Sequence, residues 1–126
     1  MCAAANESFT EYRNDARPHR SDLPACPVET TAQLIGGKWR LLIMRDLLSQ
    51  PMRFRELQRS VGGISQKVLT SNLRDMEKHG LIVRRVFPEV PPRVEYSLTE
   101  LGQSLRPIID AMRNWGLNYQ GMALED

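Results

Sequence analysis

The chain has 126 residues, 41% hydrophobic and 25% charged, with a formal net charge of +2, which suits one globular domain with a modest core. Two cysteines and two histidines, without zinc-ligand spacing, exclude a disulfide scaffold and a structural metal site. No apolar run reaches about 18 residues and the N-terminus lacks the pattern of a secretion signal. We therefore expect a cytoplasmic protein that needs no metal or other cofactor and has no membrane partner.

Positive charge is concentrated in the middle of the chain. Residues 1–50 carry six basic and six acidic side chains, whereas residues 51–93 carry nine basic side chains against four acidic ones. Residues 94–126 carry two basic side chains against five acidic ones. Lysine and arginine neutralise phosphates when a protein binds DNA, so the middle segment is where a DNA contact is expected.

Residues 1–25 are polar and show neither a helical nor a strand period, so we expect a flexible N-terminal tail. The pattern changes at Cys26, because Pro27 suits the first turn of a helix that ends before Gly36. A second helix is predicted from about Lys38 to Ser49, and a third from about Arg53 to Val61.

The segment between Ile64 and Gly80 predicts a helix with two distinct faces. Ser65 can cap its first free amides, Ile64 can pack back onto Leu69, and Gly80 suits its left-handed end. At about 100° per residue, polar and basic side chains share one arc and apolar ones the other. The polar arc, with the cap, gives the candidate base-contacting residues: Ser65, Gln66, Lys67, Thr70, Ser71, Arg74 and Lys78. The alternative is an ordinary solvated helix face.

A short helix, a glycine turn and a polar-faced helix follow one another in the order of a helix-turn-helix motif. Residues 81–87 and 93–98 are rich in β-branched and aromatic side chains, and they flank a proline-rich loop at 88–92. Because proline cannot donate to a strand ladder, these segments predict a two-stranded hairpin, or wing. Arg84, Arg85 and Arg93 would bring positive charge to the sugar-phosphate backbone or the minor groove, whereas Glu89 would keep the loop tip clear of DNA.

The C-terminal segment from Thr99 predicts a long helix with one apolar stripe. Its apolar side chains recur at steps of four and three, as in a coiled-coil seam: Leu101, Leu105, Ile108, Met112, Trp115 and Tyr119. Pro107 is expected to kink this helix. The stripe could pack on its own domain, but burial in a homodimer is the interpretation we favour.

Several fragments in this order resemble the HxlR-type transcriptional regulators, a winged helix-turn-helix family of bacterial dimers. They are Cys26-Pro27-Val28-Glu29, Ile35-Gly36-Gly37-Lys38-Trp39, Arg53-Phe54-Arg55-Glu56-Leu57, residues 63–70 and residues 88–99. The resemblance spans Cys26 to about Gly116. It implies a mainly α fold with a small β-hairpin, in which a winged helix-turn-helix domain over 26–121 lies between a tail at 1–25 and a tail at 122–126.

The resemblance also implies a function. The helix after Ser65 would enter the major groove of double-stranded DNA, the hairpin would be the wing, and the first and last helices would form a homodimer. This implication adds Val28 and Ile35 to the dimer contacts. A symmetric dimer would bind a pseudo-palindrome with half-sites about one helical turn, or a multiple of it, apart.

Cys26 is a candidate redox sensor. At the N-terminus of a helix its sulfur lies near the positive end of the dipole, which favours the thiolate, whereas the charge of Glu29 opposes it. The resemblance implies that some family members sense oxidants or electrophiles at this position. Members that form a disulfide between subunits usually use a second cysteine farther along the chain. No cysteine follows Cys26 here, which leaves sulfenic acid, an adduct, a mixed disulfide, or pairing with Cys2 or Cys26 of another subunit. The alternative is a helix cap without a signalling role.

Other functions leave weaker signals. The sequence has no phosphate-binding loop, nucleophile elbow or metal-spaced histidine pair, so catalysis is not expected. A winged-helix module for protein contacts or nonspecific DNA binding would share the fold. A small-molecule effector between dimer arms, near Trp39, Trp115 and Tyr119, is a further alternative to those aromatics being core residues.

Overall fold

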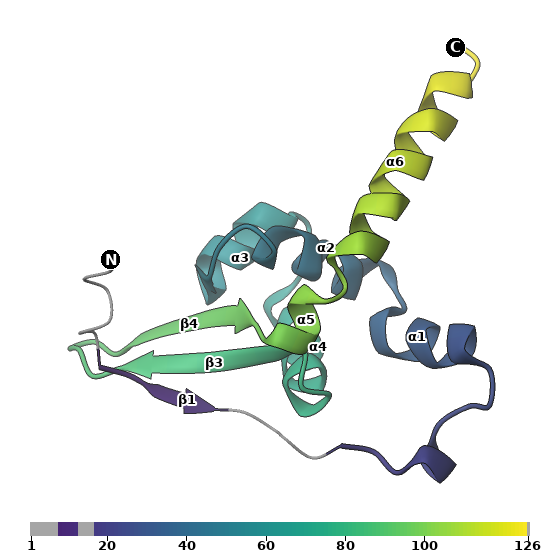
Figure 1. Ribbon diagram of the computed structural model, residues 1–126. Coiled ribbons are helices and arrows are strands. Elements are labelled where there is room, and N and C mark those ends of the chain that lie inside the picture. Colours follow the sequence, from purple (N-terminus) through teal and green to yellow (C-terminus); the bar gives the residue numbers. More distant parts are fainter. Residues whose placement is uncertain (1–7, 13–16, 126) are drawn as a thin grey trace, which may run out of the picture.

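The computed structural model describes residues 8–12 and 17–125. The elements in these ranges are β1 (Thr10–Tyr12), η2 (Arg20–Asp22), α1 (Pro27–Ile35), α2 (Lys38–Leu47), β2 (Met52–Arg53), α3 (Phe54–Val61), α4 (Gln66–Lys78), β3 (Ile82–Phe87), β4 (Arg93–Leu98), α5 (Glu100–Gln103) and α6 (Arg106–Met122). Helices α2 to α4 gather beside one end of the β3–β4 hairpin, and α6 projects away from them (Figure 1). The predicted mainly α fold with a winged helix-turn-helix is confirmed.

The hydrophobic core lies where α2, α3 and α4 meet the inner ends of β3 and β4. On the apolar arc of α4, Leu69, Leu73 and Met76 are all buried, as predicted for that arc, whereas Val68 at its edge is 36% exposed. The core side chains with the least exposure are Ile43, Met44, Leu47, Leu57, Leu69, Met76 and Ile82. Burying each large apolar side chain contributes about 1.5 to 3 kcal/mol, so this cluster fixes the position of α4.

Both predicted ends of α4 are observed. The Ser65 hydroxyl accepts a hydrogen bond from the Val68 amide, with 3.1 Å between Oγ and N. Gly80 adopts a φ of 77°, the left-handed conformation that favours glycine. In the turn before α4, the Gln58 side chain donates to the Ile64 carbonyl at 3.2 Å. The helix is therefore held at its start, at its end and along its apolar face.

The sheet is larger than the sequence predicts. It has four antiparallel strands in the order β1-β3-β4-β2, and the predicted β3–β4 hairpin forms its centre. The sequence predicts no strand among residues 1–25, and this expectation is wrong for Thr10–Tyr12, which pair with β3. β2 was also missed, because a two-residue strand shows no period of its own.

The C-terminal segment is broken into two helices instead of forming one kinked helix. α5 ends at Gln103 and α6 begins at Arg106, so Pro107 lies in the first turn of a new helix, where its missing amide costs no hydrogen bond. Thr99 caps α5 by accepting from the Gly102 amide at 3.0 Å, and its hydroxyl donates to the Gly80 carbonyl at 2.6 Å. α5 is thereby attached to the end of α4, whereas no residue of α6 is buried.

Candidate nucleic-acid interface

The exposed face of α4 carries side chains that can contact base edges. Gln66, Lys67, Ser71, Arg74 and Lys78 are exposed, and Thr70 is half-buried. Six residues line one shallow hollow along this face: Gln66, Lys67, Thr70, Ser71, Arg74 and Asp75. Arginine matches the acceptors of guanine and glutamine those of adenine in the major groove. The predicted set thus lies together on one face, except Ser65, whose hydroxyl is used by the helix cap.

Arg40 of α2 supports this face from behind, and the sequence analysis missed it. Its guanidinium donates to Asp75 Oδ2 at 3.1 Å and to the Leu34 carbonyl at 3.1 Å, so it joins α1, α2 and α4. The Arg40 side chain is only 15% exposed, whereas that of Asp75 is 52% exposed. Nothing in the local pattern distinguishes Arg40 from an ordinary surface arginine, because its partners lie elsewhere in the chain.

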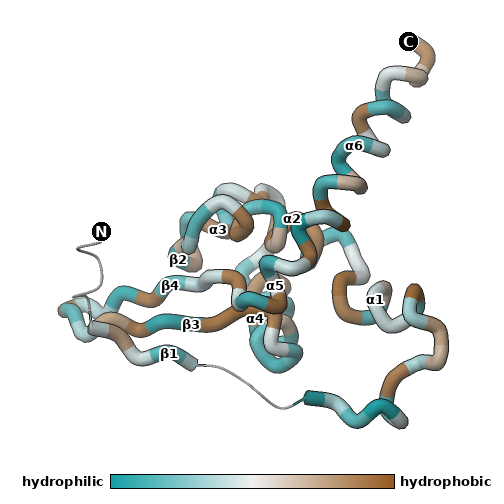
Figure 2. The backbone as a smooth tube through the Cα atoms, in the orientation of Figure 1, coloured by the Kyte–Doolittle hydropathy of each residue, from teal (hydrophilic) through white to brown (hydrophobic). Residues whose placement is uncertain are grey.

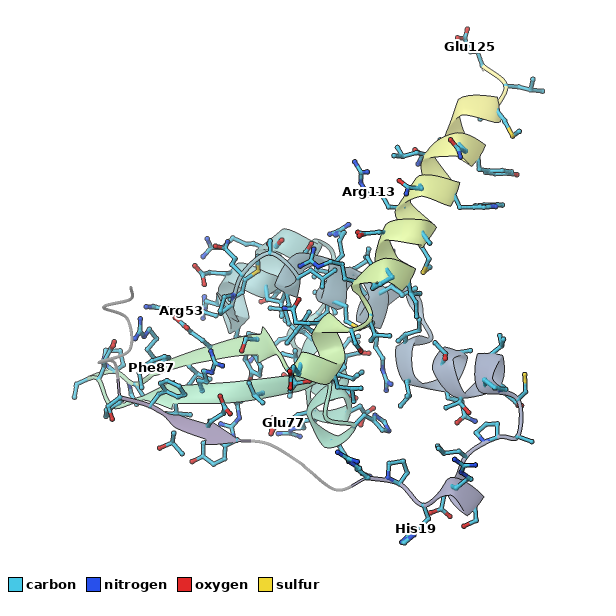
Figure 3. The ribbon with its side chains drawn as sticks, in the orientation of Figure 1. His19, Arg53, Glu77, Phe87, Arg113 and Glu125 are labelled. Atoms are coloured by element: carbon cyan, nitrogen blue, oxygen red, sulfur yellow. The ribbon has the colours of Figure 1, made fainter. Side chains whose placement is uncertain are left out.

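Arg84 extends the basic surface from α4 onto the wing. It lines a second hollow together with Thr70, Leu73, Arg74, Glu77 and Tyr96. Its Nε lies 3.7 Å from Glu77 Oε1, and its guanidinium carbon lies 4.4 Å from the centre of the Tyr12 ring. Figure 3 shows Glu77 on the α4 side of the sheet. Burial raises the pKa of Tyr96 above its ordinary value, and the nearby charge of Arg84 opposes this effect.

Arg85 and Arg93 lie on the other face of the wing, because successive residues of a strand alternate between faces. Arg85 Nε contacts Glu11 Oε2 at 2.9 Å. Arg93 contacts Glu89 at 3.3 Å and Glu95 at 3.6 Å, and its guanidinium lies 3.9 Å from the centre of the Phe87 ring. These two arginines are engaged within the wing, away from the α4 hollow that Arg84 shares.

The predicted dimer residues divide into two groups. Ile35 is buried in the core cluster and Leu105 is half-buried against that cluster, so their part in a subunit contact stays a prediction. The others are exposed: Val28, Leu101, Ile108, Met112, Trp115 and Tyr119. Trp115 and Tyr119 stack with ring centres 5.3 Å apart. Figure 2 shows apolar residues recurring along α6 where it leaves the body, and Arg113 extends from this helix clear of the body (Figure 3).

Cys26 is a free, exposed thiol at the N-cap of α1. The residues around it line a shallow hollow between η2 and α1: Arg20, Leu23, Pro24, Ala25, Pro27, Thr30 and Thr31. Cys2, its predicted alternative partner, lies outside the described residues. In the described ranges, no group of three histidine, cysteine or acidic side chains is arranged to hold a metal ion.

The aromatic residues predicted near an effector pocket occupy separate places. Trp39 is half-buried against the core, and the Lys38 ammonium lies 4.6 Å from its ring centre. Trp115 and Tyr119 lie on the exposed stripe of α6. A small-molecule effector stays a prediction.

Among the described helices, none combines the length and apolar character needed to cross a bilayer.

Comparison with known proteins places this geometry in a family. The family model described as HxlR-like helix-turn-helix matches residues 34–123. The HTH-type transcriptional regulator YdeP of Bacillus subtilis (strain 168) is 46% identical over 99 residues, which are 79% of this chain and 77% of that protein.

Solved structures give the same result. The redox regulator HypR in its oxidised form is 44% identical, with a TM-score of 0.71 over 74% of this chain and 96% of that chain. Diamide-treated YodB from B. subtilis is 36% identical, with a TM-score of 0.63 over 75% of this chain and 94% of that one. Members of this family are transcriptional regulators and not enzymes. The chain belongs to the HxlR-like helix-turn-helix family of transcriptional regulators.

Proposed function

We propose that the protein is a homodimeric, sequence-specific regulator that binds a pseudo-palindromic site in double-stranded DNA, in the cytoplasm. The observation that carries this proposal is the exposed row of polar and basic side chains on α4, which have the donors and acceptors to contact base edges and are continuous with Arg84 on the wing. In this arrangement Gln66 and Arg74 contact base edges, and Lys67, Lys78 and Arg84 contact phosphates. Whether the protein activates or represses transcription would depend on where its operator lies relative to the promoter.

Homodimer formation is supported by the apolar stripe of α6. Trp115 is 68% exposed and Tyr119 62%, on a helix that has no buried residue of its own. Large apolar side chains exposed in one stripe at helical spacing are typical of a helix that packs against a second copy. Two copies joined through α6 would present two α4 helices, which matches a two-fold symmetric site.

The test compares binding to a duplex selected from random DNA with binding to its scrambled counterpart. A specific regulator prefers the selected site by about 10³-fold or more. Arg74→Ala should weaken specific binding by about 1 to 3 kcal/mol, as expected for one lost base contact, and change scrambled-DNA binding much less. Equal affinity of the natural protein for both duplexes would contradict the proposal and favour a nonspecific or protein-binding module.

A second candidate function, control by oxidants or electrophiles, is favoured by the accessible thiol of Cys26. The similarity to a redox regulator and to a protein solved after diamide treatment supports it. The thiolate would add to a ring carbon of an electrophilic quinone: one S–C bond forms, the ring C=C π bond breaks, and its electron pair passes to the carbonyl oxygen, which takes a proton from solvent. The bulky group at the start of α1 would then alter the contacts of this helix.

The matched variants are Cys26→Ser and Cys2→Ser. Treatment with a quinone should lower operator affinity of the natural protein and of Cys2→Ser, and mass spectrometry should find one adduct on Cys26. Cys26→Ser should keep its affinity after the same treatment. Equal loss of binding in all three proteins would show that Cys26 has no part in the response.

A further inference from the structure

We propose that the N-terminal strand β1 is a working part of the wing and that Tyr12 is the residue that positions Arg84 for contact with a DNA phosphate. This inference rests on the proposed function, because it assigns a role within the same interface. β1 precedes the segment matched by the family model, which begins at residue 34. The wing of this chain is thus built partly from residues outside the matched domain.

The backbone pairing makes β1 continuous with the wing. Thr10 is opposite Val86, Glu11 opposite Arg85 and Tyr12 opposite Arg84 in an antiparallel register. An unpaired strand edge exposes amides and carbonyls, and β1 covers this edge of β3. The pairing widens the wing on the side on which α4 lies (Figure 1).

Side chains on the outer face attach β1 to the hairpin. The Phe9 ring packs against Phe87 with 5.2 Å between centres, and Glu11 contacts Arg85 at 2.9 Å. Phe87 is only 5% exposed although it ends a strand near the wing tip. These contacts fix the register of β1 and leave Tyr12 on the opposite face, toward α4.

On that face, Tyr12, Arg84 and Tyr96 form one cross-strand row. The Arg84 guanidinium carbon lies over the Tyr12 ring, 4.4 Å from its centre, and a cation–π contact of this kind uses none of the N–H groups as hydrogen-bond donors. Glu77 lies 3.7 Å from Nε, beyond a normal hydrogen bond. The ring thereby holds the guanidinium beside Thr70 and Arg74 with donors available for a phosphate.

Tyr12→Leu tests this role because it removes the aromatic face, and Tyr12→Phe is its matched control because it keeps it. Tyr12→Leu should weaken DNA binding about two- to fivefold, the range for one exposed cation–π contact. Tyr12→Phe should bind like the natural protein. Because a phosphate contact carries no sequence information, the loss should be the same on a selected duplex and on its scrambled counterpart.

A double-mutant cycle separates positioning from a general effect on folding. In an Arg84→Gln background, Tyr12→Leu should no longer change affinity, whereas in a Lys67→Gln background, which removes a proposed phosphate contact that does not touch β1, it should retain its full effect. An equal loss in both backgrounds would overturn the inference, as would unchanged or tighter binding by Tyr12→Leu. Failure of the proposed function would be recognised differently, because the natural protein would then bind the selected and scrambled duplexes equally. The effect of Tyr12→Leu on affinity could still be measured on either duplex.

Discussion

Arg40 of α2 and Asp75 of α4 form an ion pair, with 3.1 Å between Nη2 and Oδ2, behind the surface proposed to contact DNA. Asp75 itself lines the hollow on that surface, so it is a negative charge where phosphates would approach. The nearby guanidinium of Arg40 compensates this charge and also joins α4 to the end of α1. The pair therefore affects both stability and the electrostatics of the interface.

Arg40→Met should lower the free energy of unfolding by about 1 to 2 kcal/mol, because it leaves the Leu34 carbonyl and the Asp75 carboxylate without this donor. It should also weaken binding to all DNA sequences, since the charge of Asp75 is no longer compensated. Urea unfolding and fluorescence anisotropy measure the two effects. Arg59→Met, at an exposed position of α3, is the control, and a similar change in both variants would contradict a specific role for the pair.

The two neighbouring arginines of β3 should differ in their effect on DNA binding. Arg84→Gln should reduce the slope of log affinity against log salt by about 0.9, the contribution of one phosphate contact. Arg85→Gln should leave that slope nearly unchanged, because its side chain contacts Glu11 on the other face. Affinities measured between low and high salt give both slopes, and equal reductions would show that both arginines contact phosphate.

Trp115→Glu should convert the dimer to a monomer, because it places a charge in the centre of the apolar stripe of α6. Sedimentation equilibrium would then give the mass of a single chain, and binding to a two-half-site duplex should fall more than binding to one half-site. Arg113→Glu, on the opposite side of α6, is the control and should stay dimeric. A dimeric Trp115→Glu protein would place the subunit contact elsewhere.

Gly102→Ala should destabilise the domain by about 1 to 3 kcal/mol, the usual cost of overpacking. A Cβ at this position would lie 2.2 Å from the Leu81 carbonyl oxygen and within 3.2 Å of the Leu98 side chain. Gly121→Ala is the control, because a Cβ there meets no atom within 4 Å. If urea unfolding showed both variants to be as stable as the natural protein, the close approach of α5 to Leu81 and to the end of β4 would be contradicted.

The parts of the fold that sequence predicts are those with local signals. Ser65 and Gly80 define both ends of α4, and the spacing of Leu69, Leu73 and Met76 defines its buried face. The hairpin was predictable because residues 88–92 cannot continue a strand. Because side chains along a strand alternate between faces, the sequence could also have placed Arg84 and Arg85 on opposite faces. The prediction instead treated all three arginines of the wing as one group.

Other features depend on contacts that no local pattern records. β1 has three residues, and its position is set by Phe9 against Phe87 and by the pairing with β3, both distant in sequence. Pro107 suits a kink and a first helical turn equally well, and only the packing of α5 distinguishes them. Arg40 was missed for the same reason, since its role depends on Leu34 and Asp75 being brought to it by the fold.

The Thr99 hydroxyl has a mechanical consequence for the arrangement of the two halves of the molecule. Because it bonds to the Gly80 carbonyl while capping α5, it joins the end of α4, the exit of β4 and the start of α5. Ser104 and Leu105 join α5 to α6 in a tight turn, in which the Leu105 amide donates to the Gly102 carbonyl at 3.1 Å, and Arg106 at the start of α6 donates to the Leu48 carbonyl at 2.9 Å. In the proposed dimer through α6, the direction in which this turn holds α6 sets the separation of the two α4 helices, which makes the turn the place to alter when the preferred half-site spacing is to be changed.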